Sequence, residues 1–265
     1  MLKAHIVDSL TLLLLNYIIN TQVIESLLET SLRQFVAAGE EGNLFLAEKS
    51  GLKLVFPLKS NDNERDRTRI SEQEIRFLFI RAIDNAKDFD GYYAVEVPTV
   101  KKYRFKDIQP IVTGENKMDG YCSASIDVCL YNSKLDRTNL IEFKAHNAPL
   151  KHIEKDILKL VKESGDNYFV HVLKNIDNGT LPNVIDKYKG SISHVWPSDK
   201  CKNNCRRLTF YICVKSHSLI FKKTIELSQD SESDQLVREL AGKFQWSHDD
   251  ITIEGWEKIK VISGE

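Results

Sequence analysis

Two apolar runs with a polar segment between them constrain the fold of this 265-residue chain more than any other feature. Residues 125–131 and 139–145 are rich in apolar and β-branched residues, whereas residues 132–138 are polar, and this pattern predicts a β-hairpin. Because side chains alternate across a strand, Glu142 and Lys144 must emerge on the same face of the second strand. The hairpin therefore carries two charged residues side by side in a mostly apolar segment.

The register of the hairpin decides whether a third charged residue joins them. A turn centred near residues 134–135 places Asp127 opposite Glu142 and on the same face, whereas a slip by one residue would move Asp127 to the other face. In the predicted register, two carboxylates and the Lys144 ammonium group converge in the middle of a sheet. Burying charges without partners is costly, so such a group is expected to bind a metal ion or to perform chemistry.

The three residue types suggest one reaction class. Two neighbouring carboxylates repel each other, and each has a raised pKa unless a cation lies between them. Oxygen ligands suit a hard divalent ion such as Mg2+, which can activate a bound water and neutralise charge on a phosphoryl oxygen. Lys144 is placed to orient that water or to stabilise the charged transition state. The pattern predicts metal-assisted hydrolysis of a phosphodiester, with Mn2+ able to replace Mg2+.

At Asp127 and at Glu142-Phe143-Lys144 the chain resembles the PD-(D/E)xK nuclease superfamily, which has the restriction-endonuclease-like fold. The motif of that superfamily is an Asp on one strand and a (D/E)-x-K triplet on the next. The resemblance covers about residues 66–175, and Ser125-Ile126 stands where the superfamily often has a Pro. It implies a core of helix, three strands, helix and strand (αβββαβ), and Mg2+-dependent cleavage of nucleic acid.

The superfamily usually supplies a third carboxylate from the first core helix, which the apolar spacing predicts over about residues 71–87. By motif position this carboxylate is Glu74, which makes Glu74 a candidate catalytic residue and metal ligand. Two alternatives stay open. Ser71 and Glu74 also form a capping box, in which the Glu closes onto the backbone of the N-cap. Glu72 falls within the apolar stripe of the same helix and is the other candidate.

Three basic residues are candidate substrate contacts. Lys102 and Arg104 belong to a basic stretch with interleaved aromatics, residues 101–106, a composition that neutralises phosphates and stacks on bases. The same alternation also describes an ordinary half-exposed strand. Lys155 lies on a helix predicted over residues 150–164, and in the superfamily the helix after the triplet contacts substrate. A solvated helix face explains most of the charges there equally well.

The composition is that of an ordinary soluble globular protein, and the resemblance implies the α/β (α+β) fold class. Hydrophobic residues make up 42% and charged residues 28%, and the length suffices for one sizeable core with accessory segments. We expect an N-terminal helical and hairpin segment at residues 1–60, and a nuclease-like core with a mixed central sheet, flanking helices and extra strands at residues 61–228. A C-terminal extension packed on the core is expected at residues 229–265.

Charge and cysteine content restrict the expected partners and cellular compartment. The net charge is −1, so no global basic field announces a nucleic-acid partner, and any such site must be a local patch. Five cysteines without disulfide-framework spacing favour a reducing cytoplasm. The apolar run at residues 10–19 is interrupted by Asn16 and is far shorter than the ~20 residues of a membrane span, so no membrane partner is expected.

The leading hypothesis is a Mg2+-dependent deoxyribonuclease, more consistent with an endonuclease than with an exonuclease. DNA versus RNA stays open, as does oligomeric state, with a homodimer as one option because double-strand cutters often need two active sites. One alternative is a nuclease-like fold that binds nucleic acid or a protein without cutting. Another is an unrelated α/β protein in which Glu142 and Lys144 form a surface pair, which a structure with Asp127 far from Glu142 would establish.

Overall fold

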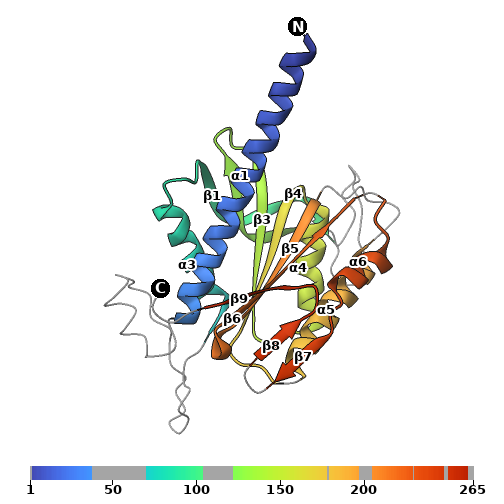
Figure 1. Ribbon diagram of the computed structural model, residues 1–265. Helices are drawn as coiled ribbons and strands as arrows, with labels where there is room; N and C mark the ends of the chain where they lie inside the picture. The colour runs from blue at the N-terminus through green and yellow to red at the C-terminus, as the bar shows by residue number, and fades with distance from the viewer. Residues whose placement is uncertain are drawn as a thin grey trace.

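The computed structural model describes residues 2–37, 70–103, 122–177, 179–196, 205–228, 230–247 and 250–261, with the side chains of residues 20 onward, Cys122 excepted. These residues form a mixed α/β structure (Figure 1). Its helices are α1 (Leu2–Ala37), α3 (Glu72–Asn85), α4 (Leu150–Lys162), α5 (Thr180–Val195), α6 (Ser233–Leu240) and the short 3-10 helix η1 (Lys215–His217). Its strands are β1 (Gly91–Tyr103), β2 (Cys122–Asn132), β3 (Arg137–Ala145), β4 (Gly165–Leu173), β5 (Cys205–Val214), β6 (Leu219–Glu226), β7 (Phe244–Ser247), β8 (Asp250–Ile253) and β9 (Glu257–Lys260).

Seven of the strands form one mixed sheet in the order β1-β2-β3-β4-β5-β6-β9. β1, β2 and β3 are antiparallel neighbours, β3, β4 and β5 run parallel, and β6 and β9 return to antiparallel pairing. β7 and β8 form a separate hairpin. From α3 to β4 the element order is helix, three strands, helix and strand, which is the order expected from the sequence.

The β2–β3 hairpin has the predicted register. Its turn is closed by the Asn132 side chain, whose Oδ1 accepts hydrogen bonds from the backbone N–H groups of Lys134 and Asp136 at 2.9 Å each. Val128 pairs with Ile141, so Asp127 and Glu142 are the next residues on the two strands. The pairing shifts between Leu130 and Tyr131, close to the turn. The register from Leu130 back to Val128, on the side of Asp127, is not affected. The convergence predicted for Asp127 and Glu142 is therefore present.

The sheet separates two hydrophobic layers (Figure 1). On one face, Ile141 and Phe143 of β3 pack with residues of α1 and α3, and the Phe143 ring lies 6.0 Å from that of Phe79. On the other face, Leu140 and Phe169 pack with residues of α4, α5 and α6. The alternation along β3 thus directs Ile141 and Phe143 toward α3 and Glu142 toward α4, as the strand period requires.

The long helix α1 crosses the α3 side of the sheet, and its amino-terminal part projects beyond the sheet (Figure 1). The carboxyl-terminal part of α1 is held against the core by four buried residues, Ile24, Leu28, Leu32 and Phe35. This spacing of three and four residues places one helix face on the sheet. Within the residues that the structure describes, no helix combines the length and the apolar character needed to cross a membrane.

β1 runs through Pro98 to Tyr103, because β1 is at the edge of the described sheet and the missing N–H of Pro98 can face away from β2. The carboxyl-terminal extension expected at residues 229–265 contains the β7–β8 hairpin and β9, which pairs with β6. The hairpin expected within residues 1–60 lies outside the described residues.

Candidate active site

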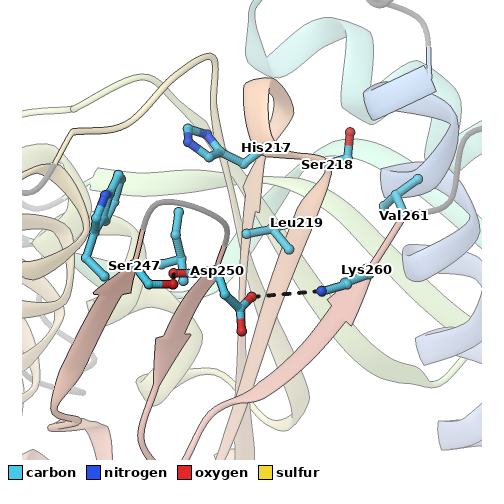
Figure 2. Close-up of a pocket in the computed structure, with 9 residues that line it drawn as sticks. His217, Ser218, Leu219, Ser247, Asp250, Lys260 and Val261 are labelled. Atoms are coloured by element: carbon cyan, nitrogen blue, oxygen red, sulfur yellow. Dashed lines mark hydrogen bonds and ion pairs between the residues drawn. The ribbon is translucent and has the colours of Figure 1, made fainter.

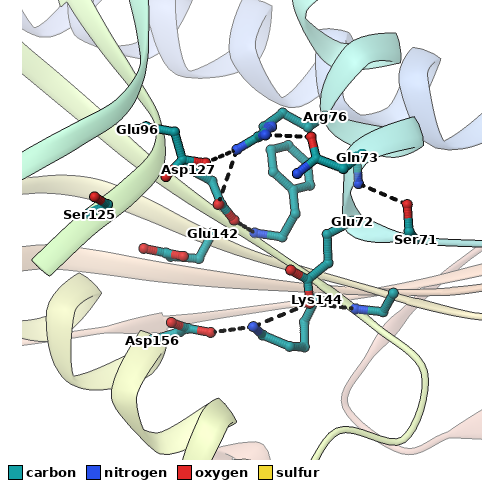
Figure 3. A network of polar contacts seen from close by, with 12 residues as sticks. Ser71, Glu72, Gln73, Arg76, Glu96, Ser125, Asp127, Glu142, Lys144 and Asp156 are labelled. Carbon is teal, nitrogen blue, oxygen red and sulfur yellow. Dashed lines mark hydrogen bonds and ion pairs between the residues drawn. The ribbon is translucent and has the colours of Figure 1, made fainter. Parts of the chain in front are cut away.

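Asp127, Glu142 and Lys144 lie together where β2 and β3 run between α3 and α4 (Figure 3). Asp127 reaches across to β3, where its Oδ2 accepts a hydrogen bond of 2.8 Å from the backbone N–H of Phe143. This bond fixes the position of the Asp127 carboxylate relative to the (D/E)-x-K triplet. Glu142 is 3% exposed and Asp127 has a side chain that is 20% exposed, so one carboxylate is buried and the other is accessible from solvent.

Helix α4 adds two charged residues to the cluster. Lys159 Nζ lies 2.6 Å from Glu142 Oε1 and 2.9 Å from Asp156 Oδ1, and it donates a hydrogen bond of 2.9 Å to the carbonyl of Ser125. Lys144 Nζ lies 2.7 Å from Asp156 Oδ2. Asp156 and Lys159 are three residues apart on α4 and so share one helix face. Sequence reasoning missed both, although two charges beside the apolar positions of this helix were a signal for them.

Helix α3 contributes Glu72 rather than Glu74. Glu72 Oε1 lies 3.3 Å from Lys144 Nζ and accepts a hydrogen bond of 3.4 Å from the backbone N–H of Ala145. Glu74 is buried at the start of the helix, where its carboxylate accepts a hydrogen bond from the hydroxyl of the N-cap residue Ser71. Residues two apart on a helix point about 200° away from each other, so only one of the two can reach Lys144. The structure therefore places Glu74 in the helix cap, and the contact expected there is made by Glu72.

Arg76, one helical turn after Glu72, is a further residue that sequence reasoning missed. Its Nη1 lies 3.5 Å from Asp127 Oδ1 and also forms an ion pair with Glu96, while its Nη2 donates to the Gln73 side chain (Figure 3). Glu96 is exposed and has a left-handed backbone with a φ of 51°. The surface position expected for Glu96 is confirmed, but its partner Arg76 connects it to Asp127.

The charged residues alternate in sign from the sheet to α3. We call this series the charge chain: Glu142, Lys159, Asp156, Lys144 and Glu72, joined by ion pairs of 2.6, 2.9, 2.7 and 3.3 Å. Each ammonium group in it lies between two carboxylates. Such an arrangement offsets part of the cost of removing the charges from water.

Burial and neighbouring charges shift the pKa values in this cluster. Burial raises the pKa of Glu142 well above its ordinary value, and the charge of Asp156 adds to the effect while Lys159 opposes it. Burial also raises the pKa of Asp127, against the hydrogen bond from Phe143. For Lys144 and Lys159, burial lowers the pKa, but the neighbouring carboxylates outweigh it and the pKa of each is raised. Both lysines are therefore charged at neutral pH.

The carboxylate oxygens of this cluster are of the chemical type that hard divalent cations bind. Glu142 Oε1 and Asp156 Oδ2 are buried, and each lies within 2.7 Å of a lysine ammonium group. Asp127 retains Oδ1, whose contact with Arg76 is 3.5 Å long. Among the described residues, the carboxylates do not form a ready cluster of three around one point. Lys159 Nζ instead lies between Glu142 and Asp156, in the position of a cation that bridges them.

Of the three candidate substrate contacts, the structure describes Lys102 and Lys155. Lys102 lies on β1 with an exposed side chain, and Lys155 lies on α4, one helical turn before Lys159. Arg104 lies outside the described residues. His146, directly after the end of β3, has a left-handed backbone with a φ of 61°, and its Nε2 makes a hydrogen bond of 2.9 Å with the carbonyl of Ile70.

Comparisons of this chain with protein-family models, with curated proteins and with solved structures gave no match. The function is therefore inferred from the arrangement of the residues alone.

Proposed function

We propose that this chain is a metal-dependent nuclease with a restriction-endonuclease-like core, and that it hydrolyses phosphodiester bonds of DNA as an endonuclease. The observation that carries the proposal is the juxtaposition of Asp127, Glu142 and Lys144 on adjacent positions of β2 and β3. The element order from α3 to β4, with β3 and β4 parallel, supports the same core.

In this proposal Asp127 and Glu142 hold the metal ion, and Asp156 replaces Glu74 as the third carboxylate. Asp156 is favoured because it is buried and because it shares Lys159 with Glu142. Mg2+ suits these oxygen ligands, and Mn2+ is expected to substitute for it. When bound, the ion would supply an activated water and neutralise charge on a phosphoryl oxygen.

The residues of the chain have distinct tasks in the reaction. Lys144 is kept charged and in place by Asp156 and Glu72, so its ammonium group can donate to the attacking water or to a phosphoryl oxygen. The bond from Phe143 holds the Asp127 carboxylate in a fixed orientation. The contact of Arg76 with Asp127 is long, at 3.5 Å. Arg76 can therefore supply a guanidinium group to a substrate phosphate.

Cleavage of supercoiled plasmid DNA in Mg2+ tests this function. Lys144→Ala is expected to lower the rate by about 100- to 1,000-fold, the usual effect of removing one group that stabilises transition-state charge, and Asp127→Asn is expected to abolish cleavage. Lys134→Ala, which removes an exposed lysine from the turn of the same hairpin, is the matched control. Cleavage at the wild-type rate by folded Lys144→Ala or Asp127→Asn protein would refute the proposal.

A second candidate function is a non-catalytic module with the same fold that binds nucleic acid or a protein. The observation that favours it is the internal charge balance: Asp127, Glu142 and Asp156 are matched by Arg76, Lys144 and Lys159 without any metal ion. Isothermal titration calorimetry of wild type and Asp127→Asn with Mg2+ and Mn2+ separates the two functions. Heat of binding in wild type that disappears in Asp127→Asn supports the nuclease, whereas no binding in either supports the module.

A further inference from the structure

A small pocket lies apart from the charge chain, between η1, the β7–β8 hairpin and the end of β9 (Figure 2). Its volume is about 240 Å3. Leu219 and Ile251, both buried, contribute its apolar surface. Aromatic and polar side chains from three separate elements complete the lining, so the pocket forms only when β9 and the hairpin are packed on the core.

One wall of the pocket is aromatic and exposed. Trp246 is 40% exposed, whereas the other tryptophans, Trp196 and Trp256, are 2% and 7% exposed. The His217 ring lies 5.9 Å from the Trp246 ring at an angle of 70°, an edge-to-face contact. Together with the exposed fraction of 40%, this edge-to-face contact leaves part of the indole open to solvent, where a flat ligand can stack.

The rim of the pocket carries charged groups of both signs, a carboxylate and an ammonium group. Asp250 accepts a hydrogen bond from Lys258, and its Oδ1 lies 3.9 Å from Lys260 Nζ (Figure 2). The side chain of Lys260 is 65% exposed and has no closer carboxylate among its described ion pairs. A carboxylate beside an aromatic face can accept from the amino group of a heteroaromatic ring, and an exposed lysine nearby can contact a phosphate.

The size of the pocket restricts the ligand. Pockets for drug-sized molecules have about 300–1,000 Å3, so a pocket of about 240 Å3 suits a single ring system. A nucleobase has the required flat surface and polar edge, and stacking of bases on aromatic side chains is the usual way that proteins hold single strands.

The pocket and the charge chain lie at the same end of the sheet, where the parallel strands have their carboxyl ends. β3, β4 and β5 are parallel, and β9 runs in the same direction because it is separated from β5 by one antiparallel strand. Lys144 and Lys260 are both near the carboxyl ends of their strands. Four strand spacings of about 4.8 Å separate β3 from β9, or ~19 Å, which equals about five or six stacked nucleotides of one strand.

We propose that this pocket binds an unpaired nucleobase of a single-stranded nucleic acid. The base stacks on Trp246, an exocyclic amino group donates to Asp250, and Lys260 contacts the neighbouring phosphate. The choice of a nucleic acid as the ligand rests on the proposed function, but binding in the pocket does not require cleavage.

The test is fluorescence anisotropy of labelled short oligodeoxycytidine with the full-length protein in EDTA, where metal-dependent cleavage cannot proceed. Trp246→Ala is expected to weaken binding about tenfold, the effect of removing one stacking platform. Tyr92→Ala removes an exposed aromatic residue at the opposite edge of the sheet and is the matched control, with unchanged affinity expected. Because thymine lacks an exocyclic amino group, Asp250→Asn is expected to reduce the preference for oligodeoxycytidine over oligothymidine.

The outcomes separate this proposal from the proposed function. Weaker binding by Trp246→Ala with unchanged binding by Tyr92→Ala supports the pocket, even if the wild-type protein cleaves no DNA. Equal affinities of wild type and Trp246→Ala, or no binding of either oligonucleotide by wild type, overturn the pocket, even if cleavage in Mg2+ is observed. Thermal melting of each variant confirms that a loss of affinity does not reflect unfolding.

Discussion

Protonation of His171 is expected to destabilise the protein as the pH falls from 7 to 5. His171 lies on β4 opposite Lys144 and is fully buried. Its Nδ1 lies 2.7 Å from the Tyr188 hydroxyl, and its Nε2 lies 2.5 Å from the carbonyl of His146. A neutral ring satisfies both contacts, with Nε2–H donating to the carbonyl and Nδ1 accepting from the hydroxyl. Burial lowers the pKa of His171 from 6.5 to about 4, against the hydrogen bond to His146.

The size of this effect follows from proton linkage. Because the pKa is lower in the folded protein, the unfolded chain takes up the proton first as the pH falls. The stability associated with a neutral His171 is therefore complete above pH 6.5 and is lost progressively down to pH 4. One pKa unit corresponds to about 1.4 kcal/mol, so the total loss is about 3 kcal/mol, of which about 2 kcal/mol falls between pH 7 and pH 5.

Urea unfolding followed by tryptophan fluorescence measures the effect. The free energy of unfolding is determined at pH 7 and pH 5 for wild type and for His171→Gln, whose side chain does not titrate. Other titrating groups contribute equally to both proteins, so the decrease in wild type should exceed that in the variant by about 2 kcal/mol. His152→Gln, which replaces an exposed histidine on α4, should behave as wild type does. Equal decreases in wild type and His171→Gln would refute the reasoning.

Three further outcomes are expected. Ser71→Ala should lower the free energy of unfolding by about 1 kcal/mol through loss of the α3 N-cap while leaving DNA cleavage intact, which checks that Glu74 serves the cap. Phe79→Ala should cost about 3–5 kcal/mol in a urea titration, because it removes a fully buried ring between α3 and β3. Lys159→Met should leave Glu142 and Asp156 without their shared cation and lower the melting temperature. Mg2+ should then raise the melting temperature of this variant more than that of wild type, and an equal shift in both would contradict a metal site at these carboxylates.

The hairpin was predictable because its signals are local. The polar turn, the alternation along both runs and the pairing of Asp127 with Glu142 all lie within 21 residues, and turn geometry fixes the register of such a unit. The element order from α3 to β4 followed for the same reason, since each helix and strand has its own period in the sequence.

The remaining members of the site depend on how separate elements pack. Asp156 and Lys159 reach the sheet because α4 is rotated so that this face lies against β3. The sequence of the helix alone does not determine that rotation. The choice between Glu72 and Glu74 is of the same kind, because a broad apolar stripe allows α3 to turn by a residue in either direction. The pairing of β9 with β6 joins segments more than 30 residues apart, across a helix and a hairpin, and local pattern does not specify it.

The charge chain explains how such a site remains folded before any ligand binds. Glu142 and Asp156 are buried carboxylates that could not stay charged alone, and Lys159 supplies the positive charge between them. A divalent ion that binds to Glu142 must compete with this ammonium group, so affinity for the ion alone is expected to be modest. In the proposed reaction, a substrate phosphate would offer Lys144, Lys159 and Arg76 a new anion, and Glu142 and Asp156 would then be able to hold the ion. The same lysines would thus stabilise the site before a ligand binds and contact the substrate during the reaction.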